Sequence, residues 1–187
     1  MSFSQQKHKA VNDYLASCRV GDVDAPLIPL LDHVNSLEDF YSTSSCSGRM
    51  AVMESRGGKG SNRFIGKWHE KIDPETLKEV ISASDTDVWF KSEPPILHIV
   101  ARTTDAADKM LHAAREAGFK RSGLQSIKEE RNVMELLGTE FIHAQVVDEG
   151  KVIVSDEYLS ILVESADKKL EASHQKLEKL LDLIKDW

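Results

Sequence analysis

The sequence has only two cysteines, Cys18 and Cys46, among its 187 residues. They are not spaced as a C-x-x-C pair, and they do not build the disulfide framework that is typical of small secreted domains. We therefore expect both thiols to be reduced and the protein to be cytoplasmic. The polar N-terminus, residues 1–9, lacks the apolar core of a signal peptide and agrees with that expectation.

Long hydrophobic runs are also missing. No apolar run approaches the roughly 18 residues that a membrane span needs, so the sequence predicts no membrane partner. Hydrophobic residues make up 41% and charged residues 29% of the chain, which is ordinary for a globular protein. A chain of 187 residues can bury one substantial core and is short for two. We expect a single domain over residues 1–187.

Several motifs of catalysis and metal binding are absent. The chain has seven histidines, but no H-E-x-x-H, no H-x-H and no cysteine pair that could complete a metal site. The Gly-rich turn with an acidic residue about 20 positions later, typical of doubly wound nucleotide-binding sheets, is absent too. Residues 57–60 are rich in glycine but lack the Gly-Lys-Ser/Thr order of a phosphate loop. The sequence therefore predicts no metal and no Rossmann-type sheet.

The most unusual stretch is residues 41–49, Tyr-Ser-Thr-Ser-Ser-Cys-Ser-Gly-Arg, which we call the polar block. Its hydroxyl groups donate and accept hydrogen bonds, Gly48 permits a close approach, and Arg49 presents a planar fork for a phosphate or carboxylate. These properties favour a site for an anion or a polar cofactor. The alternative is a Ser/Thr-rich strand end with a buried thiol and a surface arginine.

The periodicity along the chain predicts an α+β fold. We expect helices within residues 1–36, a β-rich core over 39–154 and one long helix over 156–187. The core should form a mixed, mostly antiparallel sheet flanked by the helices. Asp24 can cap the second helix, whose first turn contains Pro26, or it can have a functional role.

The last helix carries a long apolar stripe with steps of four and three residues. Such a seam must pack on another helix, for which the N-terminal helix or a second subunit are the candidates. The sequence thus leaves a monomer and a homodimer through this helix open. The stripe consists of Leu159, Val163, Ala166, Leu170, Leu177, Leu180 and Ile184, interrupted by Ser173.

Charge is unevenly distributed along the chain. The formal net charge is −7, which argues against a protein that binds nucleic acid with its whole surface. Residues 49–71, however, hold six basic residues against two acidic ones. This basic segment can contact phosphates or can be a solvated face.

The order of residues around the polar block resembles the tRNA wybutosine-synthesising methyltransferase family, specifically its third pathway enzyme. In that family a T-S-S-C-S/A-G-R block follows a V-D-x-x-(I/V)-x-x-L helix, and three later blocks match in the same order. The family has a lysine where this chain has Val20. The matching stretches here are residues 23–31 with Val34-Asn35, residues 67–69 (Lys-Trp-His), residues 93–99 (Glu-Pro-Pro-Ile-Leu-His-Ile) and residues 117–123 (Ala-Gly-Phe-Lys-Arg-Ser-Gly).

The resemblance implies an S-adenosylmethionine-dependent methyltransferase that is not of the Rossmann type. Its substrate is the wyosine-type base next to the anticodon of phenylalanine tRNA, which it methylates on N-4. Transfer of a methyl group to a ring nitrogen is an in-line displacement that also requires the removal of one proton. The candidate general bases are Asp24, His69 and His98, among which the sequence does not choose.

The remaining site residues follow from the same resemblance and from residue chemistry. We expect Glu93 or His98 to share a cavity with residues 44–49. The candidates for cofactor binding are Ser44, Ser45, Ser47, Arg49 and Glu93; those for tRNA binding are Arg56, Lys59, Arg63, Lys67, Trp68, Phe119 and Ser122, with the two aromatic rings stacking on bases.

Two other functions stay open at the level of the sequence. One is a non-catalytic tRNA-binding module that uses the basic segment together with Trp68 and Phe119. The other is a hydrolase with Cys46 as nucleophile. That thiol would need a base such as His69 or His98, which only folding could bring near it.

Overall fold

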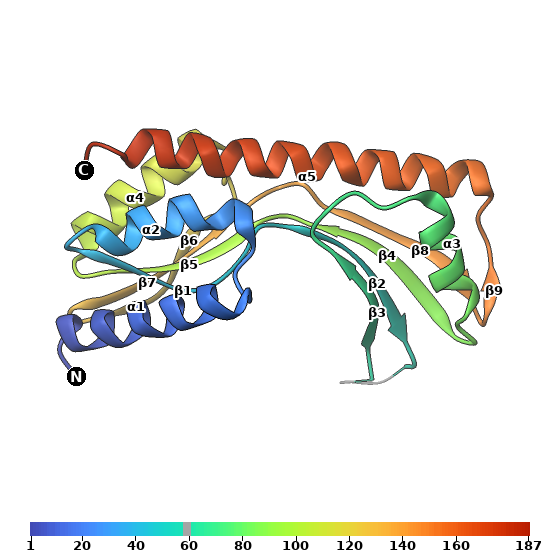
Figure 1. The fold of residues 1–187 in the computed structure, drawn as a ribbon, viewed down its shortest axis with the longest axis horizontal. Coiled ribbons are helices and arrows are strands. Elements are labelled where there is room, and N and C mark those ends of the chain that lie inside the picture. Colours follow the sequence, from blue (N-terminus) through green and yellow to red (C-terminus); the bar gives the residue numbers. More distant parts are fainter. Residues whose placement is uncertain (58–60) are drawn as a thin grey trace. The chain divides into compact units, whose positions relative to one another are not determined.

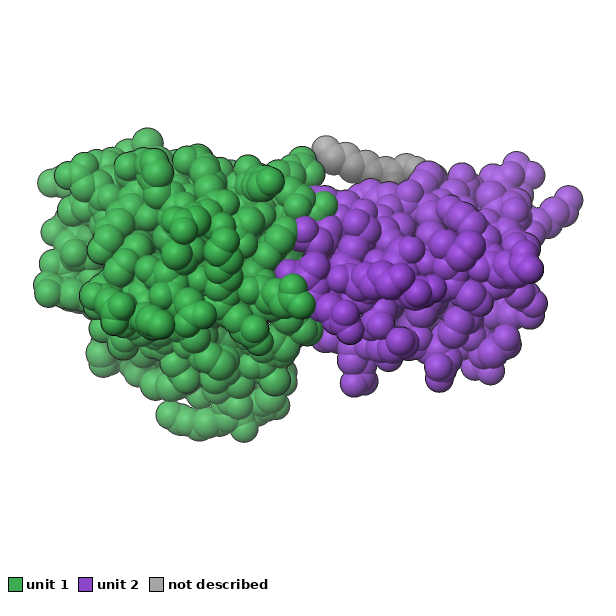
Figure 2. All heavy atoms as spheres, turned by 90° about the horizontal axis from the view of Figure 1, so that it is seen from above, with its two compact units in different colours: residues 1–47, 95–139, 173–187 green, residues 48–94, 140–172 purple. Residues whose placement is uncertain are grey.

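The computed structural model describes residues 1–57 and 61–187, which divide into two compact units (Figure 2). Unit 1 comprises residues 1–47, 95–139 and 173–187, and unit 2 comprises residues 48–94 and 140–172. Each unit contains one sheet, and every strand pairing in the described residues is antiparallel. The predicted α+β class without a Rossmann-type sheet is confirmed, and the expected single mixed sheet is corrected to two antiparallel sheets. The single domain over 1–187 stays a prediction.

The sheet of unit 1 has the strand order β1-β5-β7-β6. One face packs on α2 (Ile28–Ser36), α4 (Thr104–Ala117) and the end of α5 (Asp156–Ile184), and the other face packs on α1 (Phe3–Val20) (Figure 1). Alternation sets the two faces, since Leu97 and Ile99 lie in the first core and Val100 in the second. The strands are β1 (Phe40–Cys46), β5 (Ile96–Ala101), β7 (Arg131–Leu137) and β6 (Gly123–Lys128).

Helices α1 and α4 have ends that the sequence specifies. Ser2 and Gln5 form a capping box at the start of α1, and Thr103 accepts the N–H of Ala106 at the start of α4. Gly118 ends α4 with a φ of +111°, which favours glycine. The capping alternative for Asp24 is wrong, because its side chain makes no capping bond to the short 3-10 turn Ala25–Leu27 that precedes α2.

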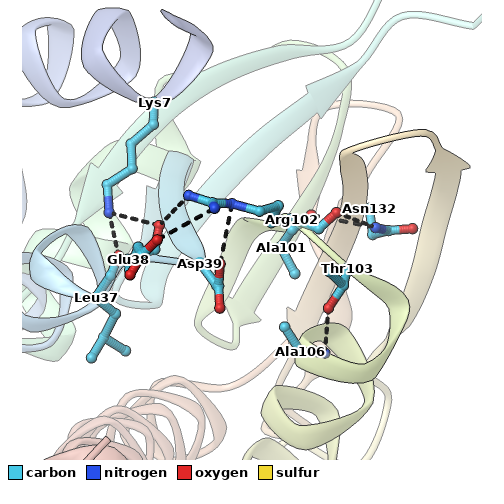
Figure 3. Close-up of polar contacts among 9 residues, drawn as sticks. All are labelled: Lys7, Leu37, Glu38, Asp39, Ala101, Arg102, Thr103, Ala106 and Asn132. Carbon is cyan, nitrogen blue, oxygen red and sulfur yellow. Dashed lines mark hydrogen bonds and ion pairs between the residues drawn. The ribbon is translucent and has the colours of Figure 1, made fainter. Parts of the chain in front are cut away.

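Polar contacts close the end of unit 1 at which β1 begins and β5 ends (Figure 3). Lys7 of α1 donates to the backbone oxygens of Leu37 and Glu38. Arg102 pairs with Glu38 at 3.4 Å and with Asp39 at 3.1 Å. Burial, followed by the charge of Arg102, lowers the pKa of Lys7. These contacts tie α1 and the residue that follows β5 to the turn that precedes β1. The Ser47 end of the polar block lies at the opposite end of β1.

The sheet of unit 2 has the order β3-β2-β4-β8-β9 and packs on α3 (Pro74–Ser82) and the first half of α5. The predicted hairpin after residue 55 is present, with Lys59 outside the described residues. Among the described residues, no helix is long and apolar enough to span a membrane. The strands are β2 (Arg49–Ser55), β3 (Arg63–Trp68), β4 (Asp87–Glu93), β8 (Ile142–Asp148) and β9 (Lys151–Val152).

Helix α5 contributes its apolar stripe to both cores. Leu159 lies in the core of unit 2, and Leu180 lies in that of unit 1. The expected partner, the N-terminal helix, is corrected to α2 and α4, because α1 covers the opposite face of the sheet (Figure 1). His33 of α2 contacts the carbonyl oxygen of Ile184 at 2.9 Å, and a lysine of α5 donates to the last turn of α4. A homodimer through this helix would have to use residues outside the stripe.

Candidate functional site

Side chains from the segment before β1 fix the polar block at both ends. Asn35 accepts the N–H of Ser42 at 2.8 Å and donates to its Oγ at 3.0 Å. Asp24 accepts the N–H of Ser47 at 2.7 Å. Ser42 and Ser47 are 1% and 0% exposed, so both bonds satisfy backbone donors that water does not reach. Asn35 was quoted in the family pattern but was not predicted to have this role.

Strand β1 carries a bulge at Thr43 and Ser44. Ser42 lies opposite Ile99 and Ser45 opposite Leu97, so two residues of β1 face the single residue His98 of β5. Thr43 Oγ1 donates to the carbonyl oxygen of His98 at 3.2 Å. The bulge brings Ser44 Oγ to 3.1 Å from His98 Nδ1.

The contacts of His98 extend across the sheet of unit 1. Its Nδ1 also lies 3.3 Å from the carbonyl oxygen of Ser44, and its Nε2 lies 3.3 Å from Glu135 Oε2 on β7. Gln125 of β6 donates to Glu135 Oε1 at 3.2 Å. Glu135 was not predicted as a site residue. The alternation in β7, with Asn132 and Met134 buried, would have placed Glu135 on the face of His98.

A pocket of about 410 Å³ in unit 1 lies beside the polar block. This volume falls in the range of roughly 300–1,000 Å³ that small-molecule sites occupy. Ser45 Oγ is buried there and has no hydrogen-bond partner within the described part of the chain. A buried hydroxyl without a partner costs about 1–3 kcal/mol, so the pocket favours a polar ligand. It is lined by Ala10, Asp13, Tyr14, Ser17, Asp22, Val23, Leu27, Leu31, Thr43, Ser44 and Ser45.

Tyr14 forms a neutral part of the pocket wall. Its hydroxyl donates to Asp32 Oδ1 at 2.7 Å. Burial and then this hydrogen bond raise the pKa of Tyr14 above its ordinary value, so the side chain stays a phenol. The carboxylates in the pocket wall are Asp13 and Asp22.

His69 binds the residue that follows Ser47. Its Nδ1 lies 3.0 Å from the carbonyl oxygen of Gly48, which can only accept, so Nδ1 carries a proton and Nε2 is the basic nitrogen of the neutral ring. Gly48 has a φ of +98°, a conformation that favours glycine. Asp24 and His69, two of the three candidate bases, thus bind consecutive residues of the polar block.

Arg49 and Glu93 form an ion pair in unit 2. They lie directly opposite on β2 and β4, and Arg49 Nε and Nη2 both lie 2.7 Å from Glu93 Oε2. The Arg49 guanidinium also stands 5.1 Å from the centre of the Phe64 ring. The fork of Arg49 is therefore engaged by the protein itself. His98 contacts the polar block through Ser44, and Glu93 contacts it through Arg49. That residues 44–49 share a cavity with Glu93 or His98 stays a prediction.

Comparison with known proteins identifies the chain. The family model described as Methyltransferase TYW3 matches residues 5–186. The chain belongs to this family. A protein of Archaeoglobus fulgidus named tRNA(Phe) 7-((3-amino-3-carboxypropyl)-4-demethylwyosine(37)-N(4))-methyltransferase is 37% identical over 186 residues, 98% of this chain and 94% of the relative. One of Pyrococcus horikoshii, with the same name and the numeral 1, is 35% identical over 182 residues, 96% and 93% of the two chains. The family resemblance seen in the sequence is confirmed.

Solved structures agree with the membership in the TYW3 methyltransferase family. A protein from Pyrococcus horikoshii OT3 superposes with a TM-score of 0.91 at 33% identity, covering 100% of this chain and 97% of that one. A hypothetical protein from Aeropyrum pernix superposes with a TM-score of 0.76 at 32% identity, covering 86% and 99%.

Enzymes of the TYW3 methyltransferase family take their methyl group from S-adenosylmethionine, and residues that line the pocket of unit 1 could hold this donor. The carboxylates of Asp13 and Asp22 match its ammonium and ribose hydroxyls, and the unpaired hydroxyl of Ser45 offers a further hydrogen bond. Val23 and Leu27 supply apolar wall for the adenine ring and for the methylene groups beside the sulfonium. These pocket residues outside the polar block were not predicted. Asp22 adjoins the family's V-D pair in the sequence, which is the signal that could have found it.

The predicted RNA-binding arginines of this TYW3 family member are partly engaged within unit 2. Arg63 Nη2 lies 2.9 Å and Arg56 Nη2 3.6 Å from Glu54, which is only 3% exposed. Ser84 donates to the same carboxylate at 2.8 Å. The Ser84 bond and the Arg63 guanidinium hold the pKa of Glu54 below its usual range, against the effect of burial. Both arginine side chains nevertheless remain more than half exposed, Arg56 at 56% and Arg63 at 65%.

Edge strand β3 presents an exposed aromatic ring beside two cations. Phe64 is 37% exposed, and Lys67 Nζ lies 4.6 Å from its centre, on the same strand. With Arg49 the ring contacts two cations. The far edge of the Trp68 indole lies over Gly66, where a Cβ atom would be 2.1 Å from the ring. Phe64 was not among the predicted RNA contacts. The register shift between the pairs Val52/Gly66 and Met53/Phe64 puts its ring on the face of Lys67 and Arg49, opposite to that of Trp68.

Two predicted RNA contacts from residues 117–123 have structural roles. The prediction that Phe119 stacks on a base is wrong, because its ring is 0% exposed in the core of unit 1. Ser122 Oγ donates to the carbonyl oxygen of Phe119 at 2.6 Å and accepts the N–H of Leu137 at 3.3 Å, so it closes the turn after α4.

Proposed function

We propose that this protein transfers a methyl group from S-adenosylmethionine to N-4 of the wyosine-type base beside the anticodon of phenylalanine tRNA, in the cytoplasm. The observation that carries the proposal is the 37% identity, over 98% of the chain, to a relative named for this reaction. The family match over residues 5–186 and the pocket beside the polar block support it.

The pocket of unit 1 is the proposed donor site. Ser44 and Ser45 contribute their hydroxyls, and Asp22 and Asp13 contribute carboxylates that favour a cationic ligand. Bound there, S-adenosylmethionine supplies the methyl group. For Ser47, Arg49 and Glu93, contact with the donor stays a prediction, because the contacts described above join them to other groups of the protein.

The protein's chemical task is to position the base and to accept one proton from its nitrogen. Asp24, His69 and His98 are retained as candidate bases. Asp24 and His69 hold the backbone at Ser47 and Gly48. His98 is bonded to Ser44, a residue of the pocket wall. Each candidate is therefore tied directly to the polar block.

The basic hairpin of unit 2 is the proposed tRNA surface. Lys67, Arg56 and Arg63 supply positive charge, and Phe64 supplies an exposed ring on which a base can stack. Trp68 is half-buried, and its ring is held against Gly66. Lys59 is retained from the sequence alone, and Ser122 stays a prediction for a contact outside this hairpin.

Mass spectrometry of anticodon-loop fragments tests the reaction. Purified protein, S-adenosylmethionine and tRNA from cells lacking the enzyme should yield a fragment that is heavier by one methyl group. Calorimetry with S-adenosylmethionine alone should show binding that His112→Ala, an exposed change on α4, leaves unchanged. Binding of tRNA without donor binding or methylation would favour a non-catalytic module.

A Cys46→Ser variant tests the hydrolase alternative. We expect it to methylate at the wild-type rate, because the proposed reaction needs no thiolate nucleophile. Loss of all activity in a variant whose unfolding is unchanged would instead favour Cys46 as a nucleophile.

A further inference from the structure

We propose that Ser44, His98 and Glu135 form a proton relay that leads from the pocket of unit 1 across its sheet. The proposal rests on the proposed methyl transfer. Ser44 lines the pocket, its Oγ lies 3.1 Å from His98 Nδ1, and His98 Nε2 lies 3.3 Å from Glu135 Oε2. Ser44 is the group that meets the substrate, and His98 and Glu135 are positioning residues that act through it.

The backbone builds this row of groups. The bulge in β1 places both Thr43 and Ser44 against His98, so the Ser44 hydroxyl reaches the imidazole instead of pointing away from it. His98 and Glu135 are direct cross-strand partners on β5 and β7. Gln125 holds the second oxygen of Glu135 from β6. Four neighbouring residues on four strands thus form one continuous polar chain.

Both protonation states of His98 are satisfied at this position. In the neutral ring, Nε2–H donates to Glu135, and Nδ1 accepts the hydroxyl proton of Ser44. In the cation, Nδ1–H donates to the carbonyl oxygen of Ser44 at 3.3 Å, and the positive charge faces the Glu135 carboxylate. Uptake of a proton therefore leaves neither ring nitrogen of His98 without a partner, which is a property that a relay requires.

The described contacts give His98 one charged neighbour. From β7 this is Glu135, while Thr43 and Ser44 from β1 and Gln125 behind Glu135 are neutral. The side chains of His98 and Glu135 are 29% and 24% exposed, so the proton can pass on to solvent from the relay.

The proton and charge balance of the step is complete. The base nitrogen gains the methyl group and loses its N–H proton to Ser44 Oγ. The hydroxyl proton of Ser44 moves to His98 Nδ1 in the same event. The positive charge that arrived with the methyl group then rests on His98 beside Glu135, and no further reactant is needed.

The test compares Glu135→Leu and Glu135→Gln with Glu129→Gln, a matched change in the exposed turn of the same sheet. Nitrogen NMR of the protein alone reports which ring nitrogen of His98 carries the proton. Glu135→Leu should move the proton to Nδ1, while Glu135→Gln, which keeps an acceptor oxygen, should leave it on Nε2. Glu129→Gln should change nothing.

The methylation rate gives the second measurement. We expect Glu135→Leu to lower kcat about tenfold or more at unchanged KM for the donor, within the range of general acid–base effects. Glu135→Gln, which keeps an acceptor for Nε2–H, should lower kcat less than Glu135→Leu does.

A wild-type kcat and a proton that stays on Nε2 in Glu135→Leu, with an active wild-type enzyme, would overturn the relay and leave the proposed function intact. An inactive wild-type enzyme would overturn the proposed function and the relay with it. Ser44→Ala, a change at an exposed residue, serves if the Glu135 variants do not fold. An unchanged kcat in that variant would also overturn the relay.

Discussion

At the scale of single residues, Asn35 holds the start of the polar block through three hydrogen bonds to Ser42. Asn35→Ala would leave the N–H of Ser42, a residue that is 1% exposed, without its acceptor. We expect the free energy of unfolding to fall by about 1–3 kcal/mol. Urea unfolding measures this, with Asn12→Ala on the exposed surface of α1 as the control. Equal stability of the two variants would show that the Asn35 contacts do not stabilise the fold.

Arg49 is the second residue whose replacement is informative. Arg49→Ala should lower methylation at least about tenfold, which is a loss of roughly 1.4 kcal/mol of transition-state stabilisation, and should leave the fold intact. Glu93→Gln should have an effect of the same direction, because the ion pair at 2.7 Å orients the guanidinium. Steady-state kinetics measure both, with exposed Arg19→Ala as the control. Normal kinetics in Arg49→Ala would remove this residue from the site.

At the scale of secondary-structure elements, Glu54 makes the hairpin of β2 and β3 sensitive to acid. The pKa of Glu54 is lower in the folded protein, chiefly through the Ser84 hydrogen bond, so its contribution to stability is present above the unfolded value of about 4.3. That contribution is lost as the pH falls through the folded value. Glu54→Gln should therefore flatten the loss of stability below about pH 5. Urea unfolding as a function of pH measures this, and exposed Glu79→Gln should keep the wild-type slope.

The surface of β3 makes a separate prediction about tRNA affinity. Lys67→Glu should weaken tRNA binding and flatten its salt dependence, because a phosphate contact releases counterions. Phe64→Ala should weaken binding with little change in the salt slope, since stacking does not involve a charge. Binding titrations at several salt concentrations distinguish the two effects, with Lys151→Glu on β9 as the control. An unaltered salt slope in Lys67→Glu would mean that the basic segment is a solvated face.

The elements themselves were largely predictable from the sequence, because local signals mark their ends. Pro94 and Pro95 separate β4 from β5, and Gly118 ends α4. Pairing between distant strands was not predictable, because a single sequence does not reveal register. The division into two sheets, the contact of His98 with Glu135 and the burial of Phe119 all depend on such pairing and packing.

At the scale of the whole molecule, the chain passes between the units four times, at residues 47/48, 94/95, 139/140 and 172/173. Neither unit is one continuous segment, and α5 contributes to both cores. These facts support the prediction of a single cooperative domain. Most of the site candidates belong to the stretches that match the family motifs. The pocket wall also draws on residues of α1 that lie outside those stretches.

Two matched core changes test that cooperativity. Leu180→Ala in unit 1 and Leu159→Ala in unit 2 remove fully buried side chains of the same helix, which are 0% and 1% exposed. Each should lower the free energy of unfolding by about 2–5 kcal/mol. Calorimetry should show one transition in both variants, displaced as a whole. Two separate transitions, each affected by one variant, would mean that the units unfold independently.

The contact of Trp68 with Gly66 also bears on how relatives of this protein diverge. Because any side chain at position 66 would begin 2.1 Å from the indole, the two positions cannot change independently in this conformation. A mutation at Gly66 would persist only in lineages where a smaller residue had already replaced Trp68. The two positions should therefore covary across the family, with glycine at the first wherever tryptophan occupies the second.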